Sequence, residues 1–588
     1  MAGTWVILAI GLPWLGALVV MCLGDQRPRW QHGVAVSFAL AAAAAGVGLL
    51  SAAGPEPALS VPLGGVFGDI SFLADGLGAF LAAVATVVGS LAVIFSVDYM
   101  QGEHQLGRYY AFVLFFIGAM AGLVLTSSLL FMFIFWEITA LTSYALISFH
   151  NDDPKAVAGG IKALIMTQLG GIGLLLGALL LFTYQHNFDM GSFLANPGRL
   201  PANVITWMAF GCLVAAAAKS AQFPFQTWLP DAMEAPTPIS ALIHAATMVN
   251  AGIYLLARFY PVFSEVAGWR EAVVVVGMLS ALLAAVMALV ANDLKRVLAY
   301  STVSQLGYMV YAVGAGGLYA SQFHLLSHAV FKALLFLSAG AVIHAVGTRD
   351  MRQMGGLGKQ MPLVRNVFLI GGLALMGIPL LNGFWSKELV LEAGLVFGEE
   401  HAMLWAYAIM LLGAGLTALY TARCIWMVFY GAPRAHLHGH DAGPAMRVAL
   451  IPLAAGTLLT WLLAEPFLRL LETVPSFHGR LGAAESGWEI LIEVLRAPAT
   501  LLALAVIGLG LLAWYFRARL AAIGRGLSVV AQAAEDSFGF EAINRGVVRW
   551  VQTTAEWLRG TQTGWLSWNV FGLLAGLAVV LLALVLGG

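Results

Sequence analysis

The stretch AAAAKSAQFPFQTW, residues 215–228, places Lys219 directly after an apolar run and Pro224 five residues later. A charged side chain inside a membrane helix costs at least about 2.5 kcal/mol on insertion scales. Proline ends or kinks a helix because it lacks a backbone N–H. Broken helices are tolerated in membranes where they line a cavity. The stretch therefore predicts a broken membrane helix with a functional lysine at the break, and a proline kink that only eases packing is the simpler alternative.

The composition extends this prediction to the whole chain. Of the 588 residues, 60% are hydrophobic and only 10% are charged, which is too few charges to cover a water-soluble protein of this size. A formal net charge of −1 gives no indication of a nucleic-acid partner. The three cysteines are far apart, and neither a GxGxxG motif nor a P-loop occurs, so the sequence predicts no cofactor in this chain.

The chain offers about sixteen apolar runs of roughly 20 residues, the length that a helix needs to span a bilayer. The predicted spans of this all-α membrane protein are 4–23, 32–53, 77–97, 109–127, 129–149, 160–184, 203–221, 238–258, 272–291, 297–316, 323–346, 364–391, 402–430, 446–468, 499–516 and 565–586. The first run lacks a basic leader and a cleavage site, so we expect it to be retained. Most Lys and Arg lie in the odd-numbered loops, which the positive-inside rule assigns to the cytoplasm. Both termini are therefore predicted outside, in a multi-pass protein of the cytoplasmic membrane.

Ionisable residues inside the predicted spans are the candidates for function, because insertion selects against them. They are Glu137, Lys219, His244, His324, His328, Lys332 and Lys387. In FHLLSHAVFKALLF (323–336), the residues His324, His328 and Lys332 recur every four positions. They therefore line one helix face and can pass a proton along it through water. For any single buried histidine, a satisfied core hydrogen bond is the alternative.

Lysine suits a proton-carrying position in a membrane. Burial favours its neutral form and a nearby carboxylate favours its charged form. Glu137 is the predicted partner of Lys219, and a change in the distance between them would load or release a proton. For Lys387 and Arg423, side chains that reach back to the membrane surface are the alternative explanation.

A second break accompanies the second lysine, since Pro379, Asn382 and Gly383 precede Lys387. Paired breaks in two halves of a chain are typical of inverted repeats around a transport site. The sequence therefore predicts two half-channels. The first uses Glu137, Lys219 and His244, and the second uses His324, His328, Lys332 and Lys387.

Two other features are weaker. Residues 517–557 alternate apolar and charged side chains, which predicts an interfacial amphipathic helix, with an ordinary cytoplasmic loop as the alternative. The loop RAHLHGHD holds His436, His438 and His440, which could bind a metal at the surface. Short loops of this kind usually stay solvated, so no metal site is predicted.

Long stretches of the chain resemble the antiporter-like subunits of respiratory complex I and of Mrp cation/proton antiporters. The resemblance covers about residues 70–430 and is carried by KSAQFPFQTWLPDAMEAPTPISALIHAATMVNAGIYLLAR (219–258), STVSQLGYM (301–309) and HAVFKALLFLSAGAVIHAVGTRDMRQMGGL (328–357). It implies two inverted five-helix repeats, each with a broken helix, flanked by further helices. It also implies that the amphipathic stretch is a lateral helix of the kind found in the L subunit of complex I.

The resemblance implies a role for each matched residue. Glu137 would be the charge partner, Lys219 the first-channel lysine and His244 the connector. Lys332 would be the central relay, and Lys387 the exit of the second channel. The implied organisation is 1–108 for the N-terminal helices, 109–258 and 272–430 for the two repeats, 431–516 for the C-terminal helices, 517–560 for the lateral helix and 561–588 for the final span.

Details of the motifs divide between the two branches of the family. GIPLLNGFWSKE and GTRD resemble the Mrp A subunit, and Gln168 and Gly171 stand where complex I subunits usually have Arg and Asp. DAMEAPTPISALIHAATM and SQLGYM resemble complex I, and Asn250 stands where the Mrp A subunit tends to have a lysine.

The sequence therefore predicts a proton-translocating subunit of the L (chain 5) type in a complex I-related assembly, a class that includes membrane-bound hydrogenases. Its partners would be antiporter-like and small hydrophobic membrane subunits, and redox chemistry would reside in other chains. An Mrp-type subunit that exchanges Na⁺ or K⁺ for protons is the first alternative. A structural clamp with an inactive channel is the second.

Overall fold

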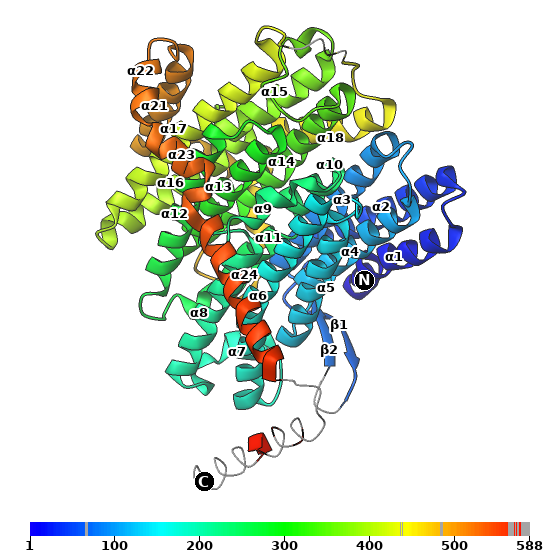
Figure 1. Cartoon of the computed structure of the whole chain (residues 1–588). Helices are drawn as coiled ribbons and strands as arrows, with labels where there is room; N and C mark the ends of the chain where they lie inside the picture. The colour runs from blue at the N-terminus through cyan, green and yellow to red at the C-terminus, as the bar shows by residue number, and fades with distance from the viewer. Residues whose placement is uncertain are drawn as a thin grey trace. The chain divides into compact units, whose positions relative to one another are not determined.

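The computed structural model describes residues 1–64, 69–434, 437, 439–481 and 486–561, together with 570, 572 and 575–577. Among these residues, thirteen helices are long and apolar enough to cross a membrane. The chain forms two compact units, Met1–Ala531 and Gln532–Gly588. The predicted all-α membrane fold is confirmed, and Figure 1 shows long helices packed side by side in the first unit.

The elements follow the chain in four groups. The N-terminal elements are α1 (Ala2–Leu23), α2 (Pro28–Ser51), β1 (Pro57–Pro62), β2 (Asp69–Leu73), α3 (Gly76–Tyr99) and α4 (Leu106–Leu125). The next group is α5 (Leu129–Ile147), α6 (Pro154–Gln185), α7 (Met190–Ala195), α8 (Ala202–Lys219), α9 (Trp228–Asp231), α10 (Thr237–Ala241), the π-helical turn η4 (Leu242–Ala246) and α11 (Asn250–Phe263). The third group is α12 (Trp269–Val290), α13 (Leu294–Gly314), α14 (Leu318–Val346), α15 (Pro362–Met376), α16 (Asn382–Glu400), α17 (Leu404–Ile425) and the π-helical turn η6 (Trp426–Tyr430). The last group is α18 (Pro444–Leu459), α19 (Ala464–Leu471), α20 (Gly487–Arg496), α21 (Pro498–Tyr515), α22 (Ala521–Gly526), α23 (Ser528–Glu535) and α24 (Phe540–Thr561).

Both predicted helix breaks are present. α8 ends at Lys219 because Ala221 adopts a left-handed φ of 51°, which a helix cannot include. α15 ends at Met376 and is followed by Gly377, whose φ of 88° suits a helix C-terminus, and α16 begins at Asn382. The predicted span 364–391 is therefore two helices.

Other segments differ from the sequence prediction. The strands β1 and β2 form an antiparallel hairpin that was not predicted, and the Ser127 N–H donates to Ser71 of β2 at 3.0 Å. The stretch 517–560 is divided among α22, α23 and α24 instead of forming one helix. Ser537 and Phe538 have positive φ, which accounts for the break between α23 and α24. Almost all of the predicted last span, 565–586, lies outside the described residues.

Small residues allow several helices to approach closely. A Cβ on Gly173 of α6 would lie 2.2 Å from the carbonyl oxygen of Gly211 of α8. A Cβ on Gly307 of α13 would lie 2.6 Å from the carbonyl oxygen of Gly277 of α12. Membrane helices depend on such close packing because lipid provides no hydrophobic drive for helix association.

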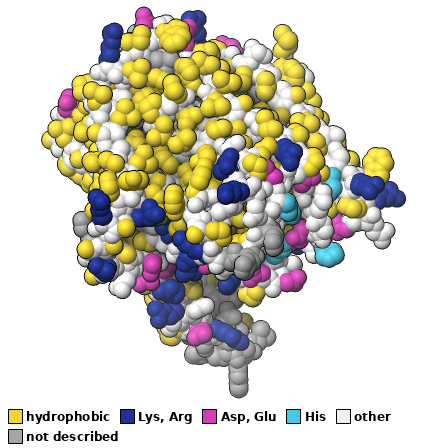
Figure 2. Space-filling model, turned by 90° about the horizontal axis from the view of Figure 1, so that it is seen from above, with side chains coloured by type: hydrophobic (Ala, Val, Ile, Leu, Met, Phe, Trp, Pro, Cys, Tyr) yellow, Lys and Arg dark blue, Asp and Glu magenta, His cyan; other side chains and the backbone are white. Residues whose placement is uncertain are grey.

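The surface of the first unit suits lipid. Ile172 and Leu18 are 61% and 63% exposed. Figure 2 shows a broad hydrophobic surface, with Lys, Arg, Asp, Glu and His side chains gathered along one part of the view. An apolar surface of this extent marks a membrane-facing protein, so the prediction of a multi-pass membrane protein is confirmed.

Ion pairs connect the second and third groups of helices at one end of the bundle. Arg349, which follows α14, pairs with Glu234 at 2.5 Å and with Asp293 at 2.6 Å. Asp231 of α9 pairs with Lys162 of α6 at 2.7 Å. These contacts join the turn after α9, the start of α13 and the end of α14.

A fully buried ion pair joins α3 to α11. Asp75 caps the N-terminus of α3 by accepting from the Gly78 N–H, and both of its oxygens accept from the Arg258 guanidinium. Arg258 also lies 5.2 Å from the centre of the Tyr254 ring. Removing one partner of such a pair leaves a buried charge without compensation, which costs about 3–5 kcal/mol.

We therefore expect Arg258→Ala to lower the free energy of unfolding by about 3–5 kcal/mol. Arg469→Ala is the matched control, because Arg469 pairs on the surface with Glu465 and its loss should cost less than about 1 kcal/mol. The measurement is chemical unfolding of the purified protein in detergent, followed by circular dichroism. Equal stabilities of the two variants would contradict the assigned role of the buried pair.

Candidate functional site

Lys219 is the last residue of α8, and its side chain is fully buried. Its Nζ donates to the backbone carbonyl of Trp136 at 2.7 Å and lies 5.0 Å from the centre of the Trp136 ring. A carbonyl dipole and an aromatic face both stabilise an ammonium group away from water. The lysine thus has partners for its charged form at the end of a broken helix.

Glu137 follows Trp136 on α5 and is half-buried. It lies near enough to Lys219 for a Coulomb interaction, but the structure describes no direct ion pair between the two. A Cβ on Gly171 of α6 would lie 2.5 Å from Glu137 Oε1, so a glycine at this position leaves room for the carboxylate. Glu137 and Gln168 line a cavity of about 400 Å³ between α5 and α6.

His244 lies in the π-helical turn η4 and is fully buried. Its ring centre is 6.3 Å from that of Trp228 and 6.0 Å from that of Phe336 on α14. The Trp228 Nε1–H donates to the Ala218 carbonyl at 2.9 Å, next to Lys219. Neither ring nitrogen of His244 has a hydrogen-bond partner among the described residues. His244 therefore lies between the end of α8 and α14.

The three predicted residues of α14 are all buried and share one face of the helix. His324 Nδ1 lies 2.9 Å from Ser386 Oγ on α16, and its Nε2 lies 3.2 Å from Gln305 Oε1 on α13. His328 lies beside the backbone of Ala245 in the turn η4.

Lys332 completes this face one turn after His328. Its Nζ donates to the Ser301 hydroxyl and, at 3.3 Å, to the Leu298 carbonyl, both on α13. Its side chain is fully buried, and no carboxylate pairs with it among the described residues. The lysine is therefore held by neutral oxygens, which can accept from either protonation state of the amine.

Lys387 lies in the first turns of α16, immediately after the second break. Its Nζ donates to the Leu375 carbonyl at 2.9 Å and approaches that of Met376 at 3.5 Å. These carbonyls end α15, where the helix dipole favours a positive charge. The Tyr308 ring lies 5.5 Å from the same Nζ.

Sequence reasoning missed several polar residues of the site. Glu388 is 2% exposed and follows Lys387 directly, so the string SKE was the signal that could have found it. Ser301, Gln305 and Ser386 contact the predicted residues but carry no sequence signal, because buried serines and glutamines are common in membrane helices.

The structure thus brings the α14 residues and Lys387 together through Ser386, and it connects Lys219 to His244 through Trp228. Arg423 stands apart, because it donates to the Ala291 carbonyl at 2.7 Å and to Asn292 at 2.6 Å in a connecting turn. The described residues include no group of three or more His, Cys, Asp or Glu able to hold a metal. His436 and His438 lie outside the described residues.

Comparison with known proteins gives consistent matches. Residues 126–417 match the family described as the transmembrane region of NADH:quinone oxidoreductase and Mrp antiporters. Residues 61–110 match the family described as the N-terminus of complex I chain 5. Together these matches cover the site residues from Glu137 to Lys387.

Individual relatives extend this similarity. NAD(P)H-quinone oxidoreductase chain 5 of Picosynechococcus sp. is 40% identical over 479 residues, which are 75% of this chain and 71% of that protein. NADH-quinone oxidoreductase subunit L of Escherichia coli is 38% identical over 513 residues, which are 83% and 82% of the two chains. A chain of the Mrp complex from Dietzia sp. has a TM-score of 0.84 at 27% identity over 99% of this chain, and the match spans 63% of the Dietzia chain. On this evidence the chain belongs to the family of NADH:quinone oxidoreductase and Mrp antiporter membrane subunits.

Proposed function

We propose that this chain translocates protons as the antiporter-like subunit, of the L (chain 5) type, in a complex I-related membrane assembly. The observation that supports this most is the succession of buried amines and imidazoles from Lys219 through His244 and α14 to Lys387. Buried ionisable groups of this number are costly in a membrane and mark ion pathways. The relatives named as quinone oxidoreductase subunits agree with this proposal.

In the first half, the proton would be held on Lys219. The Trp136 carbonyl and ring stabilise the ammonium, and the carboxylate of Glu137 adds a Coulomb attraction that depends on distance. If Glu137 moves away or is neutralised, the ammonium loses that attraction and releases its proton toward His244. This step requires no bond other than N–H to break.

In the second half, the proton would pass from His328 to Lys332 and then to Lys387. Lys332 and Lys387 repel each other when both are charged, so arrival of a proton at one favours release from the other. The C-terminal carbonyls of α15 hold the ammonium of Lys387, and Glu388 beside it can accept the released proton. Lys387 is therefore the proposed exit residue.

The paired breaks support the proposed organisation into inverted repeats, residues 109–258 and 272–430. Each break adjoins one of the proposed terminal lysines, Lys219 or Lys387. The distribution of Lys and Arg supports a cytoplasmic location for the odd-numbered loops and an outer location for both termini. The driving reaction would occur in partner subunits, with other membrane subunits packed against this chain.

An Mrp-type exchange of Na⁺ or K⁺ for protons is the second candidate. The similarity to the Mrp complex from Dietzia sp. over nearly the whole chain favours it. The motif GFWSKE, in which Glu388 follows Lys387, favours it as well.

Lys219→Ala should lower proton translocation by at least about 10²-fold, because it removes a positioned proton-transfer group. Lys359→Ala is the matched control, since Lys359 is an exposed lysine at the end of a short 3-10 helix, Leu357–Lys359. The measurement is acidification of inverted membrane vesicles that contain the tagged complex, with the amount of assembled complex determined in parallel. Wild-type translocation by an assembled Lys219→Ala complex would exclude the lysine mechanism.

Addition of Na⁺ or K⁺ to vesicles that hold a pH gradient separates the two candidates. We expect the gradient to persist in the absence of a driving reaction, because the proposed pump carries protons alone. The readout is a pH-sensitive dye inside proteoliposomes that contain the purified complex. Collapse of the gradient on cation addition, and its loss in Lys219→Ala, would favour the exchanger instead.

A further inference from the structure

A cluster of polar side chains lies where α14 meets the loop before α18. His344 lies twelve residues after Lys332, in the last turn of the same helix. Its ring centre is 6.1 Å from that of His440 and 5.3 Å from that of Tyr99 on α3. Both histidines are exposed.

From this cluster a line of hydroxyl groups leads inward. The Tyr99 hydroxyl lies 3.0 Å from Thr237 Oγ1 at the start of α10. Thr237, Ser240 and His244 follow at positions i, i+3 and i+7, so they share one face of the short helix and the turn η4. Exposure falls along the line, from His344 at the surface to Thr237, Ser240 and His244, which are at most 1% exposed.

The inner groups of this line have unused hydrogen-bonding capacity. Ser240 Oγ and both ring nitrogens of His244 have no hydrogen-bond partner among the described residues. A buried polar group without a partner costs about 1–3 kcal/mol, so such groups normally bond to water or to a ligand. Ser240 and His244 follow the hydrogen-bonded pair of Tyr99 and Thr237 toward the interior, so together these residues suit a path for protons.

The surface of the cluster carries an acidic group as well. Asp98 accepts from the backbone N–H groups of Ala445 and Met446 at the start of α18, and it lies within Coulomb range of His344. A carboxylate beside exposed imidazoles raises the local concentration of protons. Arg349 and Arg352 follow α14 on this face, which the positive-inside rule assigns to the cytoplasm.

We propose that His440, His344, Tyr99 and Thr237 form the mouth through which cytoplasmic protons reach Ser240, His244 and the polar face of α14. The inference rests on the proposed function and specifies its inner opening. In each transfer, an imidazole nitrogen or a hydroxyl oxygen accepts one proton and releases another to the next group. One proton moves inward in net terms, and no group is oxidised or reduced.

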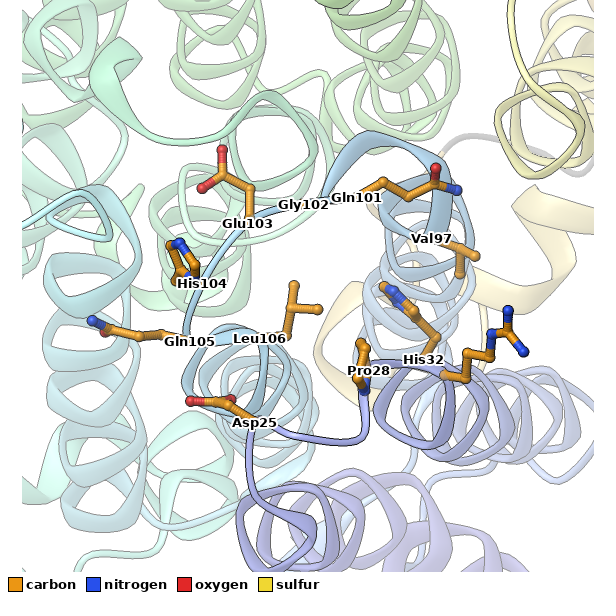
Figure 3. Close-up of a pocket in the computed structure, with 11 residues that line it drawn as sticks. Asp25, Pro28, His32, Val97, Gln101, Gly102, Glu103, His104, Gln105 and Leu106 are labelled. Carbon is orange, nitrogen blue, oxygen red and sulfur yellow. The ribbon is translucent and has the colours of Figure 1, made fainter.

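A surface pocket near α2 and α3 offers a contrasting route. It has a volume of about 720 Å³, and Figure 3 shows Asp25, His32, Glu103 and His104 among its lining residues. His32 Nδ1 lies 2.7 Å from the Tyr110 hydroxyl. The nearby Tyr109 hydroxyl bonds to Ser96 at 2.8 Å, and Ser96 donates to a backbone carbonyl at 2.7 Å. These bonds end on the backbone, and among the described residues they do not extend to His244.

The experiment compares proton uptake in inverted vesicles that contain the intact complex. The vesicles are energised by whichever reaction or ion gradient moves protons in the wild type. The test variants are His344→Ala, Tyr99→Phe and the isosteric Thr237→Val. Tyr110→Phe is the matched control, because it also removes a hydroxyl bonded near the same face. Lys219→Ala reports on the proposed function itself.

We expect each test variant to slow proton uptake several-fold and Tyr110→Phe to leave it unchanged. Imidazole in the medium should restore uptake in His344→Ala, where it replaces the lost ring, and not in Tyr99→Phe. A purely structural role for His344 would not respond to imidazole.

Uptake at the wild-type rate in all three test variants, with uptake abolished in Lys219→Ala, would overturn the proposed mouth and leave the proposed function intact. Failure of imidazole to restore a slow His344→Ala complex would overturn the role of His344 as a proton donor. Undiminished uptake in Lys219→Ala would overturn the proposed function and the mouth together.

Discussion

A positive charge in the membrane interior needs a polar partner, and the breaks in two helices provide such partners here. The end of α15 presents the carbonyls that hold Lys387, and the end of α8 directs Lys219 to the carbonyl and ring of Trp136. Lys332 lies inside the unbroken helix α14, and α13 supplies its partners, Ser301 and a carbonyl. Lys219 and Lys387 therefore lie at helix breaks, whereas Lys332 takes its partners from a neighbouring helix. In each case protein oxygens or an aromatic ring replace water around the charge.

The rest of the bundle keeps these partners within reach. Glycines such as Gly173 and Gly307 let neighbouring helices approach to backbone contact. The buried pair of Asp75 and Arg258 fixes α3 against α11, and the surface ion pairs around Arg349 join the two halves. A proton path made of short hydrogen-bonding steps depends on such rigidity, because displacements of about 1 Å weaken a hydrogen bond strongly.

The sequence was sufficient to predict the membrane fold and the residues at the breaks, because apolar run length, proline and intramembrane charge are local signals. Lys219 and Lys387 lie at breaks as predicted, and His324, His328 and Lys332 share a face. The roles assigned to these residues remain predictions.

Other features depend on contacts that the sequence does not display. The π-helical turn that holds His244 arises in the packed bundle, and the hairpin of β1 and β2 has too few residues for a clear alternating pattern. The bond from Lys219 to the Trp136 carbonyl is another such contact, because no sequence signal marks which backbone carbonyl will face a buried lysine. The sequence does not display the contact between Tyr99 and Thr237 either, because the two residues lie 138 positions apart in the chain and meet only in the fold.

The most direct test of the central claim concerns Lys332, the residue through which protons would pass between the two halves. The measurement is the number of protons translocated for each turnover of the driving reaction by the reconstituted complex, with wild-type protein and with Lys332→Gln. The account predicts that Lys332→Gln assembles normally and that its ratio falls to that of a complex in which this chain is inactive. An unchanged ratio would mean that protons do not pass along the buried face of α14.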